Sequence, residues 1–393
     1  DTLSPQVSEG SGQWSVALRH EGSRPHRVGL GLYDVAPADP GRLVLRERLE
    51  REVAWDEAES VVVADGPRPD LVLVNDGDLT YAKVRLDGGS WEAVRGALSG
   101  LPDALSRAVV WNAARDMVRD GELSPGEFLR AVAAHCPGEP DVAVLQSVLK
   151  FARGAVADRF LPAGRRVGAL ELLAGVCREV LSEGAAAGGD ASGVRLTAVR
   201  QFIDCASAPD ELYGWWAAGS VPGGPVLDAE LRWRLLLRLS VLGAVGGAEI
   251  GAALAADPSA KGEEGAARCR AALPDAAAKE AAWEAMFASD ALSNYMWRAT
   301  AEGFWQPEHR GLLGGYVERF FVDAVPVAGR RGGAGAEMVG RSGFPRTFVE
   351  DRVLRRGEEC VEAEGVSPSL RRELVDQLDE LRRAVRVRGL WEA

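Results

Sequence analysis

Apolar and polar residues alternate over short segments in the first 87 residues of the chain. Trp14, Val16 and Leu18 occupy every second position of one such segment, and similar segments recur, separated by Gly, Pro, Asp or Ser. A period of two is that of a β-strand with one buried face, and short strands with turn residues between them are typical of an antiparallel sandwich. The pattern predicts a small all-β domain over residues 1–87.

A helical period replaces this alternation from residue 88 onward. Leu105, Val109, Ala113 and Met117 recur every four residues, and Asp103 precedes them as a candidate N-cap. Apolar residues at this spacing line one face of a helix, and short acidic or hydroxyl side chains satisfy the free N–H groups at a helix start. Repetition of this pattern, with short breaks of Gly, Pro or Asp, predicts a dozen or more helices.

Helices joined by short connections, with no strands between them, are expected to pack as antiparallel pairs. We therefore expect an α+β multidomain chain, with the β-sandwich (1–87) followed by a large all-α superhelical domain of the HEAT/armadillo type (88–393). Residues 182–193 (SEGAAAGGDASG) predict a flexible loop. Residues 329–345 contain six Gly. Each costs about 1 kcal/mol relative to Ala in a helix, so this stretch is predicted as a loop or a frayed helix.

Charge and cysteine content narrow the function classes. The chain carries 46 Lys and Arg against 58 Asp and Glu, a net charge of −12, without a basic block or a long apolar run. Proteins that bind nucleic acid or anionic membranes need clustered positive charge, so we expect neither partner. The cysteines are an odd number, far apart and in apolar or Ala-rich segments, which favours buried thiols in a cytoplasmic protein; they are Cys136, Cys177, Cys205, Cys269 and Cys360.

The sequence carries no recognisable catalytic motif. None of the four histidines, His20, His26, His135 and His309, has a second histidine three or four residues away. HExxH, CxxC, GxGxxG, GxxxxGK[ST] and GxSxG sequences are all missing. Zinc hydrolase, nucleotide-binding and serine hydrolase functions therefore lack support from motifs. We expect no metal site, no cofactor and no catalytic residue within this chain.

Aromatic and arginine clusters stand out in the helical part. Trp283, Trp297 and Trp305 lie among other aromatic residues in 279–321, and 228–239 places several arginines on an apolar helix. Aromatic residues at helical spacing usually pack between helices, and such arginines usually form salt bridges with a neighbouring helix. The alternative is a concave helical surface that presents some of them to a ligand.

Several long segments resemble the aminopeptidase N family, the zinc-dependent gluzincin aminopeptidases, and actinobacterial members most of all. VLVNDGDLTYAKVRLDGGSW (72–91) is similar to the family's junction between β-sandwich and helical domain. The further similar segments are RAVVWNAARDMVRDGEL (107–123), DAELRWRLLLRLSVLG (228–243) and the 279–321 block, in the family's order. The resemblance covers the whole chain but only the C-terminal half of the family's sequence.

The resemblance implies that this chain supplies no catalytic residue. The family's zinc ligands, general base and transition-state Tyr belong to upstream domains, and their motifs do not occur here. In the family the helical domain closes the substrate cavity over a thermolysin-like catalytic domain. By this resemblance, the residues expected to line the substrate cavity are Arg232, Asn294, Trp305 and Gln306. The residues expected at the domain junction are Tyr81 and Trp91. Trp305 and Gln306 can instead lock one helical hairpin to the next.

We therefore expect the C-terminal portion of a zinc-dependent aminopeptidase that hydrolyses N-terminal amino acids from peptides. This portion would enclose and gate the substrate cavity, zinc would belong to the intact enzyme, and the partners would be the N-terminal catalytic domain and peptide substrates. A non-catalytic helical-repeat module that binds a peptide or a protein by itself is the alternative. An HExxH sequence upstream in the same reading frame would decide for the first.

Overall fold

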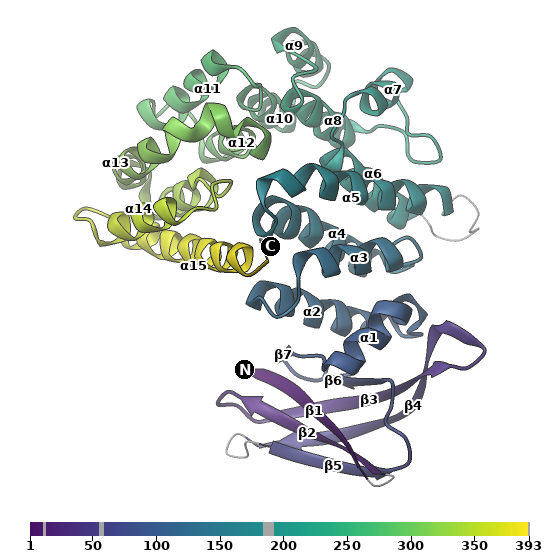
Figure 1. Ribbon diagram of the computed structural model, residues 1–393. Helices are drawn as coiled ribbons and strands as arrows, with labels where there is room; N and C mark the ends of the chain where they lie inside the picture. The colour runs from purple at the N-terminus through teal and green to yellow at the C-terminus, as the bar shows by residue number, and fades with distance from the viewer. Residues whose placement is uncertain (11–12, 55–58, 184–191, 392–393) are drawn as a thin grey trace. The chain divides into compact units, whose positions relative to one another are not determined.

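The chain places seven strands before fifteen α-helices in the part that the structure describes (Figure 1). The computed structural model describes residues 1–10, 13–54, 59–183 and 192–391. The strands are β1 (Thr2–Gly10), β2 (Gln13–Glu21), β3 (His26–Ala36), β4 (Asp39–Val53), β5 (Glu59–Asp65), β6 (Leu71–Val74) and β7 (Lys83–Val84). The predicted α+β fold class, strands first and helices after, is confirmed.

The helical part contains α-helices, short 3-10 turns and two π-helical segments. The helices up to the middle of the chain are α1 (Gly88–Ala97), η1 (Leu98–Gly100), α2 (Ala104–Asp120), α3 (Pro125–His135), α4 (Val142–Phe151), η2 (Ala152–Phe160), α5 (Ala163–Glu183), α6 (Ser192–Cys205), α7 (Asp210–Ala218) and α8 (Ala229–Val241). Those that follow are α9 (Gly247–Ala256), α10 (Ala260–Ala271), α11 (Ala276–Trp283), η3 (Glu284–Ala288), α12 (Asn294–Phe304), η4 (Pro307–His309), α13 (Arg310–Gly343), α14 (Asp351–Glu362) and α15 (Pro368–Trp391). Among the described helices none is both long and apolar enough to cross a membrane.

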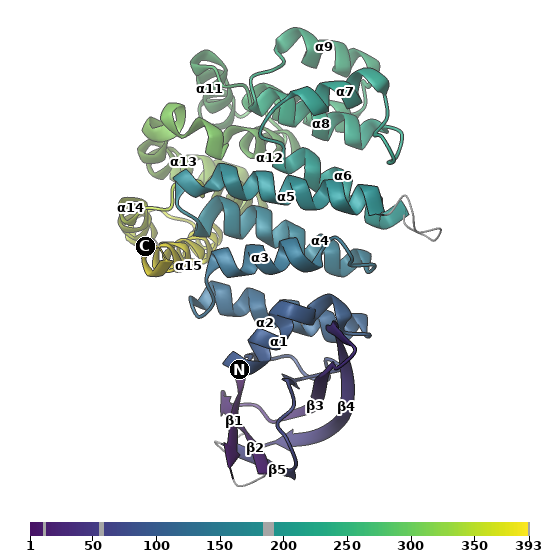
Figure 2. The same ribbon diagram turned by 45° about the vertical axis from the view of Figure 1, so that its right-hand side comes forward.

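Two small sheets form the β part. Their strand orders are β5-β2-β1-β7 and β4-β3-β6, and neighbouring strands are antiparallel except β1 and β7. The alternation expected at Trp14, Val16 and Leu18 is confirmed, since all three side chains are buried. All four residues of β6 are buried, and α1 packs against both β6 and β4. Figures 1 and 2 both show α1 between the strands and α2.

One buried carboxylate ties the strands to the first helices. Asp76 is fully buried and accepts hydrogen bonds from Tyr33 Oη (2.8 Å), Arg48 Nε (2.8 Å) and Ser106 Oγ (2.5 Å). Tyr33 lies on β3, Arg48 on β4 and Ser106 on α2, so the network spans three elements. A Cβ at Gly31 would overlap this carboxylate, which explains the glycine in β3. Removing any one donor would leave part of a buried charge unsatisfied.

The segment that resembles the family's junction contains a turn at residues 75–80 that side-chain hydrogen bonds stabilise. Asn75 and Asp78 both have positive φ, 60° and 51°, which Asn and Asp tolerate better than most residues. The Asn75 amide donates to the Thr80 carbonyl oxygen (2.9 Å) and accepts from the Thr80 N–H (3.1 Å). The sequence Asn-Asp-Gly-Asp-Leu-Thr is therefore needed for this backbone conformation.

The two aromatic residues expected at the junction have different environments. Trp91 is buried, at 7% exposure, in the face of α1 that also buries Val94. Tyr81, expected at the same junction, is 96% exposed, so its ring is not packed between the strands and the helices.

The chain divides into two compact units, each with its own dense internal packing. The N-terminal unit is Asp1–Ala152 with Ala186–Thr197, and the C-terminal unit is Arg153–Ala185 with Ala198–Ala393. The change from strands to helices lies at Asp87, the N-cap of α1, whereas the units divide at residue 152 because α1 and α2 pack against the strands. The division into 1–87 and 88–393 therefore stays a prediction about domains.

Helix starts follow the sequence signals closely. The Asp103 carboxylate accepts from the Leu105 N–H at 3.1 Å, and Ser124 Oγ accepts from the Glu127 N–H at 3.0 Å. The last helix begins at Pro368, as expected for a helix with proline in its first turn. In the C-terminal unit, helices contact their next-but-one neighbours, α8 with α10, α10 with α12, and α13 with α15, which is typical of a stacked helical repeat.

The glycine-rich stretch at 329–345 is a correction, because α13 continues through it to Gly343. Gly332 interrupts the helical backbone with a φ of 71°. A Cβ at Gly340 would lie 2.9 Å from the Glu373 side chain of α15, so glycine here permits close packing of the two helices. Tertiary packing thus overrides low helix propensity. The loop predicted at 182–193 falls mostly outside the described residues.

A cluster of buried charges joins distant segments of the C-terminal unit. Asp158 of the η2 segment pairs with Arg153 and with Arg166 of α5, the latter at 2.7 Å. Glu308 of η4 accepts from Arg166 at 3.0 Å and from Arg238 of α8 at 2.6 Å. The cluster therefore connects four elements, two of which lie about 140 residues apart in the chain.

The Glu308 carboxylate is ionised because of these arginines. Burial alone would raise its pKa, but Arg238 and Arg166 lower the pKa of Glu308 to about 2. Its second oxygen, Oε2, is buried without a hydrogen-bond partner among the described residues. The carboxylate is thus held by charge attraction to the two guanidinium groups, and replacing it would leave Arg238 without a countercharge, whereas Arg166 would keep Asp158.

A buried lysine, Lys279, caps the C-terminal ends of two helices. The Lys279 side chain is fully buried and donates to the carbonyl oxygens of Ala271 (2.6 Å) and Phe304 (3.3 Å), the last residues of α10 and α12. Carbonyl groups at helix C-termini have no partner within the helix and carry partial negative charge. Burial lowers the pKa of Lys279 to about 7, so the amine sits between its charged and neutral forms near neutral pH.

Replacing Trp91 by Ala should lower the free energy of unfolding by about 3 to 5 kcal/mol, the usual cost of removing a buried Trp side chain. Tyr81→Ala is the matched control on the same segment and should change the free energy by less than about 0.5 kcal/mol, because that side chain is exposed. Urea unfolding followed by circular dichroism measures both. Equal effects of the two variants would contradict the packing described for α1.

Replacing Glu308 by Gln should cost about 3 to 5 kcal/mol at pH 7, since Arg238 loses its countercharge and Arg166 loses one of two. The pKa of Glu308 is lower in the folded than in the unfolded state, so its contribution is present at neutral pH and is lost as the pH falls below about 4.3. Denaturation at pH 7 and pH 3.5 should show the difference from wild type shrinking by about 1 kcal/mol. Glu318→Gln, in an exposed pair with Arg356, is the control and should cost under about 1 kcal/mol.

Candidate functional site

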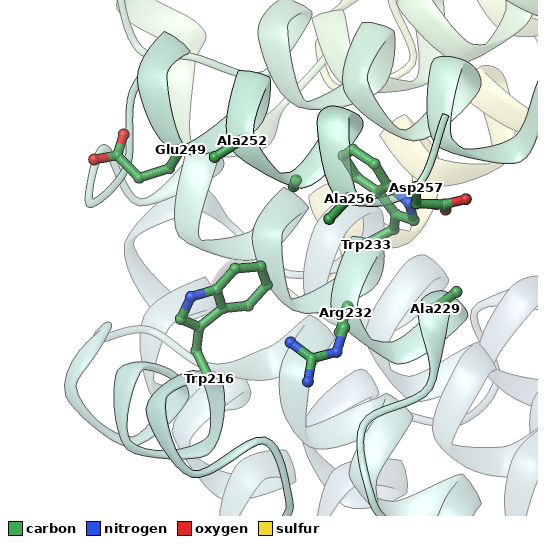
Figure 3. Close-up of a pocket in the computed structure, with 9 residues that line it drawn as sticks. Trp216, Ala229, Arg232, Trp233, Glu249, Ala252, Ala256 and Asp257 are labelled. Atoms are coloured by element: carbon green, nitrogen blue, oxygen red, sulfur yellow. The ribbon is translucent and has the colours of Figure 1, made fainter. Parts of the chain in front are cut away.

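Arg232 lines a pocket of about 540 Å³ formed by α7, α8 and α9 in the C-terminal unit. Two tryptophans, Trp216 of α7 and Trp233 of α8, and small Ala side chains of α9 form its walls (Figure 3). Leu236, Ile250, Ala266 and Cys269 form a buried core cluster, against which both tryptophans pack. The pocket is therefore a hollow with rigid apolar walls on the helical stack.

Polar groups of opposite charge flank these walls. The Arg232 guanidinium lies 5.9 Å from the Trp216 ring centre, and its Nε donates to the Leu227 carbonyl oxygen at 3.2 Å. Trp233 Nε1 donates to Asp257 at 2.8 Å, and hydrogen bonds from Ser259 and Trp233 lower the pKa of Asp257. Arg232 forms no ion pair with the described residues, so its charge is available to an anionic group.

The position of each wall residue has a local cause. Arg232 and Trp233 follow Asp228, whose side chain accepts from the Leu231 N–H at 2.8 Å and starts α8. The Trp233 ring lies against Gly265 of α10, where a Cβ would overlap it. Sequence reasoning singled out Arg232 and Trp233 within one motif but missed Trp216, for which the Trp-Trp pair at 215–216 was the available signal.

This pocket can bind a ligand but shows no catalytic arrangement. Trp and Ala surfaces suit an apolar group, and the guanidinium suits a carboxylate. Among the described residues that line it there is no nucleophile beside a base. The chemistry that the pocket supports is therefore recognition of a small apolar group bearing a negative charge.

Trp305 and Gln306 occupy packed positions. Trp305 is buried, donates through Nε1 to the Gly343 carbonyl oxygen at 2.7 Å, and contacts the rings of Phe304 and Phe348. The Gln306 amide donates to the carbonyl oxygens of Glu302 (2.9 Å) and Gly303 (3.2 Å) at the end of α12. These contacts match the packing role that the sequence also allowed, and a place for these residues in a substrate cavity stays a prediction.

Asn294 is exposed at the start of α12 and does not line the pocket of Arg232. Its Oδ1 accepts from Arg331 at 3.3 Å, and Arg331 also donates to the Leu292 carbonyl oxygen at 2.9 Å. The structure therefore does not bring the four predicted cavity residues together in one site. Of the four, Arg232 lines the pocket formed by α7, α8 and α9.

Exposed Tyr81 borders a second pocket, of about 660 Å³, within the N-terminal unit. Its walls come from the segment that precedes and includes β7 and from one face of α2, with Lys83, Arg115 and Arg119 among charged residues. Lys83 pairs with Asp120 at 2.7 Å, and the Arg115 guanidinium lies 6.0 Å from the Phe151 ring centre. This open polar hollow with one projecting aromatic ring is suited to contact with another protein surface.

Metal-type ligands come together once among the described residues, at Asp1, His20 and His26. All three lie in the β part, far from the pocket of Arg232 in sequence. The five cysteines are unpaired and buried, as expected. Burial raises the pKa of the Cys205 and Cys269 thiols to about 12, so these groups are inert at neutral pH.

Comparison with known proteins gives concordant matches. The family of ERAP1-like C-terminal domains matches residues 71–383. The chain is 34% identical over 371 residues to Aminopeptidase N of Streptomyces lividans, a match that covers 93% of this chain and 42% of that protein. The crystal structure of Legionella pneumophila aminopeptidase A in complex with aspartic acid is similar in fold, with a TM-score of 0.59, 11% identity, and coverage of 96% of this chain and 49% of that one.

These matches agree on which part of the related proteins the chain resembles. The chain spans less than half of the relative and of the solved structure that it resembles. The matched family is a C-terminal domain, and it covers most of the chain. The expected resemblance is confirmed: the chain belongs to the aminopeptidase N family, in which it corresponds to the ERAP1-like C-terminal domain.

Proposed function

We propose that this chain is the C-terminal portion of a zinc-dependent aminopeptidase that removes N-terminal amino acids from peptides. The observation that carries the proposal is a match along nearly the whole chain to less than half of Aminopeptidase N. In this proposal the chain encloses the substrate cavity and controls which peptides enter it. Its partners are the catalytic domain of the same enzyme and the peptide substrate.

The chemistry of such an enzyme does not use residues of this chain. The chain has no HExxH sequence, so it does not supply the ligands and the general base of a gluzincin zinc centre. When bound in the catalytic domain, zinc would activate water and polarise the scissile carbonyl group. The residues described here would bind and orient the distal part of a peptide and limit access of bulk solvent.

Arg232 is the residue that we assign to the distal part of the peptide. Its guanidinium has no carboxylate partner among the described residues, and Trp216 and Trp233 flank it. A peptide carboxylate on Arg232 with a neighbouring apolar side chain on the tryptophans would fit this chemistry. Exposed Asn294 is a second, separate point at which a peptide can contact the helices.

A second function, a non-catalytic module that binds a peptide or a protein by itself, is favoured by one observation. The pocket of Arg232 is complete within this chain, with its walls supported by a buried core. Under that function the isolated chain would bind peptides as tightly as any larger protein containing it. We also propose a cytoplasmic location, which the five buried free thiols support.

The isolated chain should hydrolyse no aminoacyl reporter substrate, with or without added zinc, because it lacks the HExxH sequence. The complete enzyme at the same concentration should hydrolyse it. Release of the chromogenic leaving group measures both rates. Hydrolysis by the isolated chain that survives repurification would contradict the assignment of catalysis to another part of the enzyme.

In the complete enzyme, Arg232→Ala should lower kcat/KM for long peptides about tenfold or more, since a charge-assisted hydrogen bond contributes about 1.5 to 3 kcal/mol. A single aminoacyl substrate does not reach the pocket, so its kcat/KM should not change. Kinetics with both substrate classes measure this difference.

Arg298→Ala is the matched control, because Arg298 is an exposed arginine of α12 outside the pocket. It should leave both substrate classes unchanged. If Arg232→Ala slowed short and long substrates equally and lowered the melting temperature, Arg232 would have a structural role. Tight binding of a peptide by the isolated chain, lost in Arg232→Ala, would favour the non-catalytic module.

A further inference from the structure

Three side chains that are distant in sequence meet at one end of the sheets. Asp1 immediately precedes β1, His20 lies near the end of β2, and His26 begins β3. One ligand atom from each lies within 4.8 Å of the others. His26 Nε2 lies 3.0 Å and His20 Nε2 lies 3.6 Å from Asp1 Oδ2, and the two imidazole rings are 5.1 Å apart between centres. The histidines are six residues apart, on two strands that a turn connects, so the HExxH spacing does not apply to them.

The His20 ring has a buried nitrogen without a partner. Its side chain is 1% exposed, and Nε2 forms no hydrogen bond within the described part of the chain. An unpaired buried polar atom destabilises the folded state, so such atoms are rare and need a cause. This nitrogen faces the Asp1 carboxylate at a distance too long for a hydrogen bond, which leaves room between them for a cation.

The side chains of His26 and Asp1 are oriented by hydrogen bonds to neighbouring groups. His26 Nδ1 lies 2.7 Å from Thr80 Oγ1, and Thr80 belongs to the turn that Asn75 braces. Metal-binding histidines commonly use their second ring nitrogen in this way, which orients the first toward the ion. The Asp1 carboxylate accepts from the backbone N–H of Arg24 at 3.1 Å.

The turn between β2 and β3 is shaped around the same carboxylate. A Cβ at Gly22 would overlap the Asp1 side chain, so glycine is required at this position. The nearby charged groups that face His26 are Asp1, His20 and Arg24.

We propose that His20 Nε2, His26 Nε2 and a carboxylate oxygen of Asp1 form a three-ligand site for a divalent transition ion of the zinc type. Two such ligands about 2.0 to 2.2 Å from zinc in tetrahedral geometry lie about 3.3 to 3.5 Å apart. The His26 and His20 nitrogens lie 3.0 and 3.6 Å from the Asp1 oxygen, close to that separation. Asp1 and Thr80 also line the pocket of Tyr81, which gives the fourth position a route to solvent. The ion would join the ends of β1, β2 and β3, and this role does not depend on the proposed function.

The structure without an ion offers a competing account of part of this cluster. A hydrogen bond between His26 and Asp1, with Asp1 bracing the turn at 22–24, explains the positions of those two residues. It does not explain why a second imidazole nitrogen is buried against the same carboxylate without a partner. His20 therefore distinguishes the two accounts.

The test measures metal binding by the chain, prepared with extra residues before Asp1 and a tag without histidine, so that neither a free amine nor the tag acts as ligand. Cobalt absorption spectra and zinc competition against a chromophoric chelator give stoichiometry, geometry and affinity. The expected result is one ion per chain, with intense visible bands typical of four-coordinate cobalt. Zinc should also raise the melting temperature, because it binds only the folded state.

Variants assign the ligands. His20→Gln should weaken zinc binding at least tenfold while keeping the metal-free melting temperature, because His20 Nε2 has no hydrogen bond to lose. Thr80→Val removes the group behind His26 and should weaken binding by about tenfold. His135→Gln, at a buried histidine bonded to Ser99 and the Arg95 carbonyl oxygen, is the control and should leave affinity unchanged.

Two outcomes would overturn the proposal. The first is a wild-type chain that keeps no zinc or cobalt at tens of micromolar free ion. The second is an affinity that His20→Gln does not change. Neither measurement uses the activity of the complete enzyme. Failure of the metal-site proposal therefore does not affect the proposed aminopeptidase role, and failure of that role does not affect the metal-site proposal.

Discussion

The charge cluster around Glu308 is the constraint on which the C-terminal unit depends. Buried guanidinium groups are tolerated only when each has a countercharge, and Arg153, Arg166 and Arg238 share Asp158 and Glu308. Because these residues come from η2, α5, α8 and η4, an arrangement of these elements that separated them would leave charges unpaired. Apolar packing alone would permit neighbouring helices to slide, whereas paired charges fix their register.

The last helix returns to the same region. Arg388 of α15 donates to the carbonyl oxygens of Arg159 (2.6 Å) and Asp158 (3.3 Å) in the η2 segment. A π-helical segment widens its turns and leaves carbonyl groups free to accept from outside the helix. The start and the end of the C-terminal unit are thus joined through η2, which connects the charge cluster to residues about 230 positions later.

In the N-terminal unit a single buried carboxylate, that of Asp76, connects the elements. Asp76 is held by Tyr33, Arg48 and Ser106, and it fixes α2 against the strands. The pocket of Arg232 lies in the other unit, on a stack with its own core. Each unit is therefore stabilised by its own buried contacts.

Local signals in the sequence determined much of the fold. Asp103, Ser124 and Pro368 mark helix starts because capping and proline geometry involve only nearby backbone groups. Alternation in β2 and the four-residue period of α2 predicted strands and helices correctly, since burial of one face sets both patterns. The family resemblance rested on the same kind of contiguous motif and is confirmed.

Tertiary contacts decided the rest. Apart from Gly332, the glycines of 329–343 are helical, and close packing of α15 on α13 at Gly340 favours this although propensity alone opposes it. Tyr81 is exposed, while Trp305 is enclosed by rings from distant segments. His20, His26 and Asp1 meet only when both sheets are formed. Sequence determines what short-range geometry and periodic burial can specify, whereas the meeting of distant side chains depends on how the elements pack.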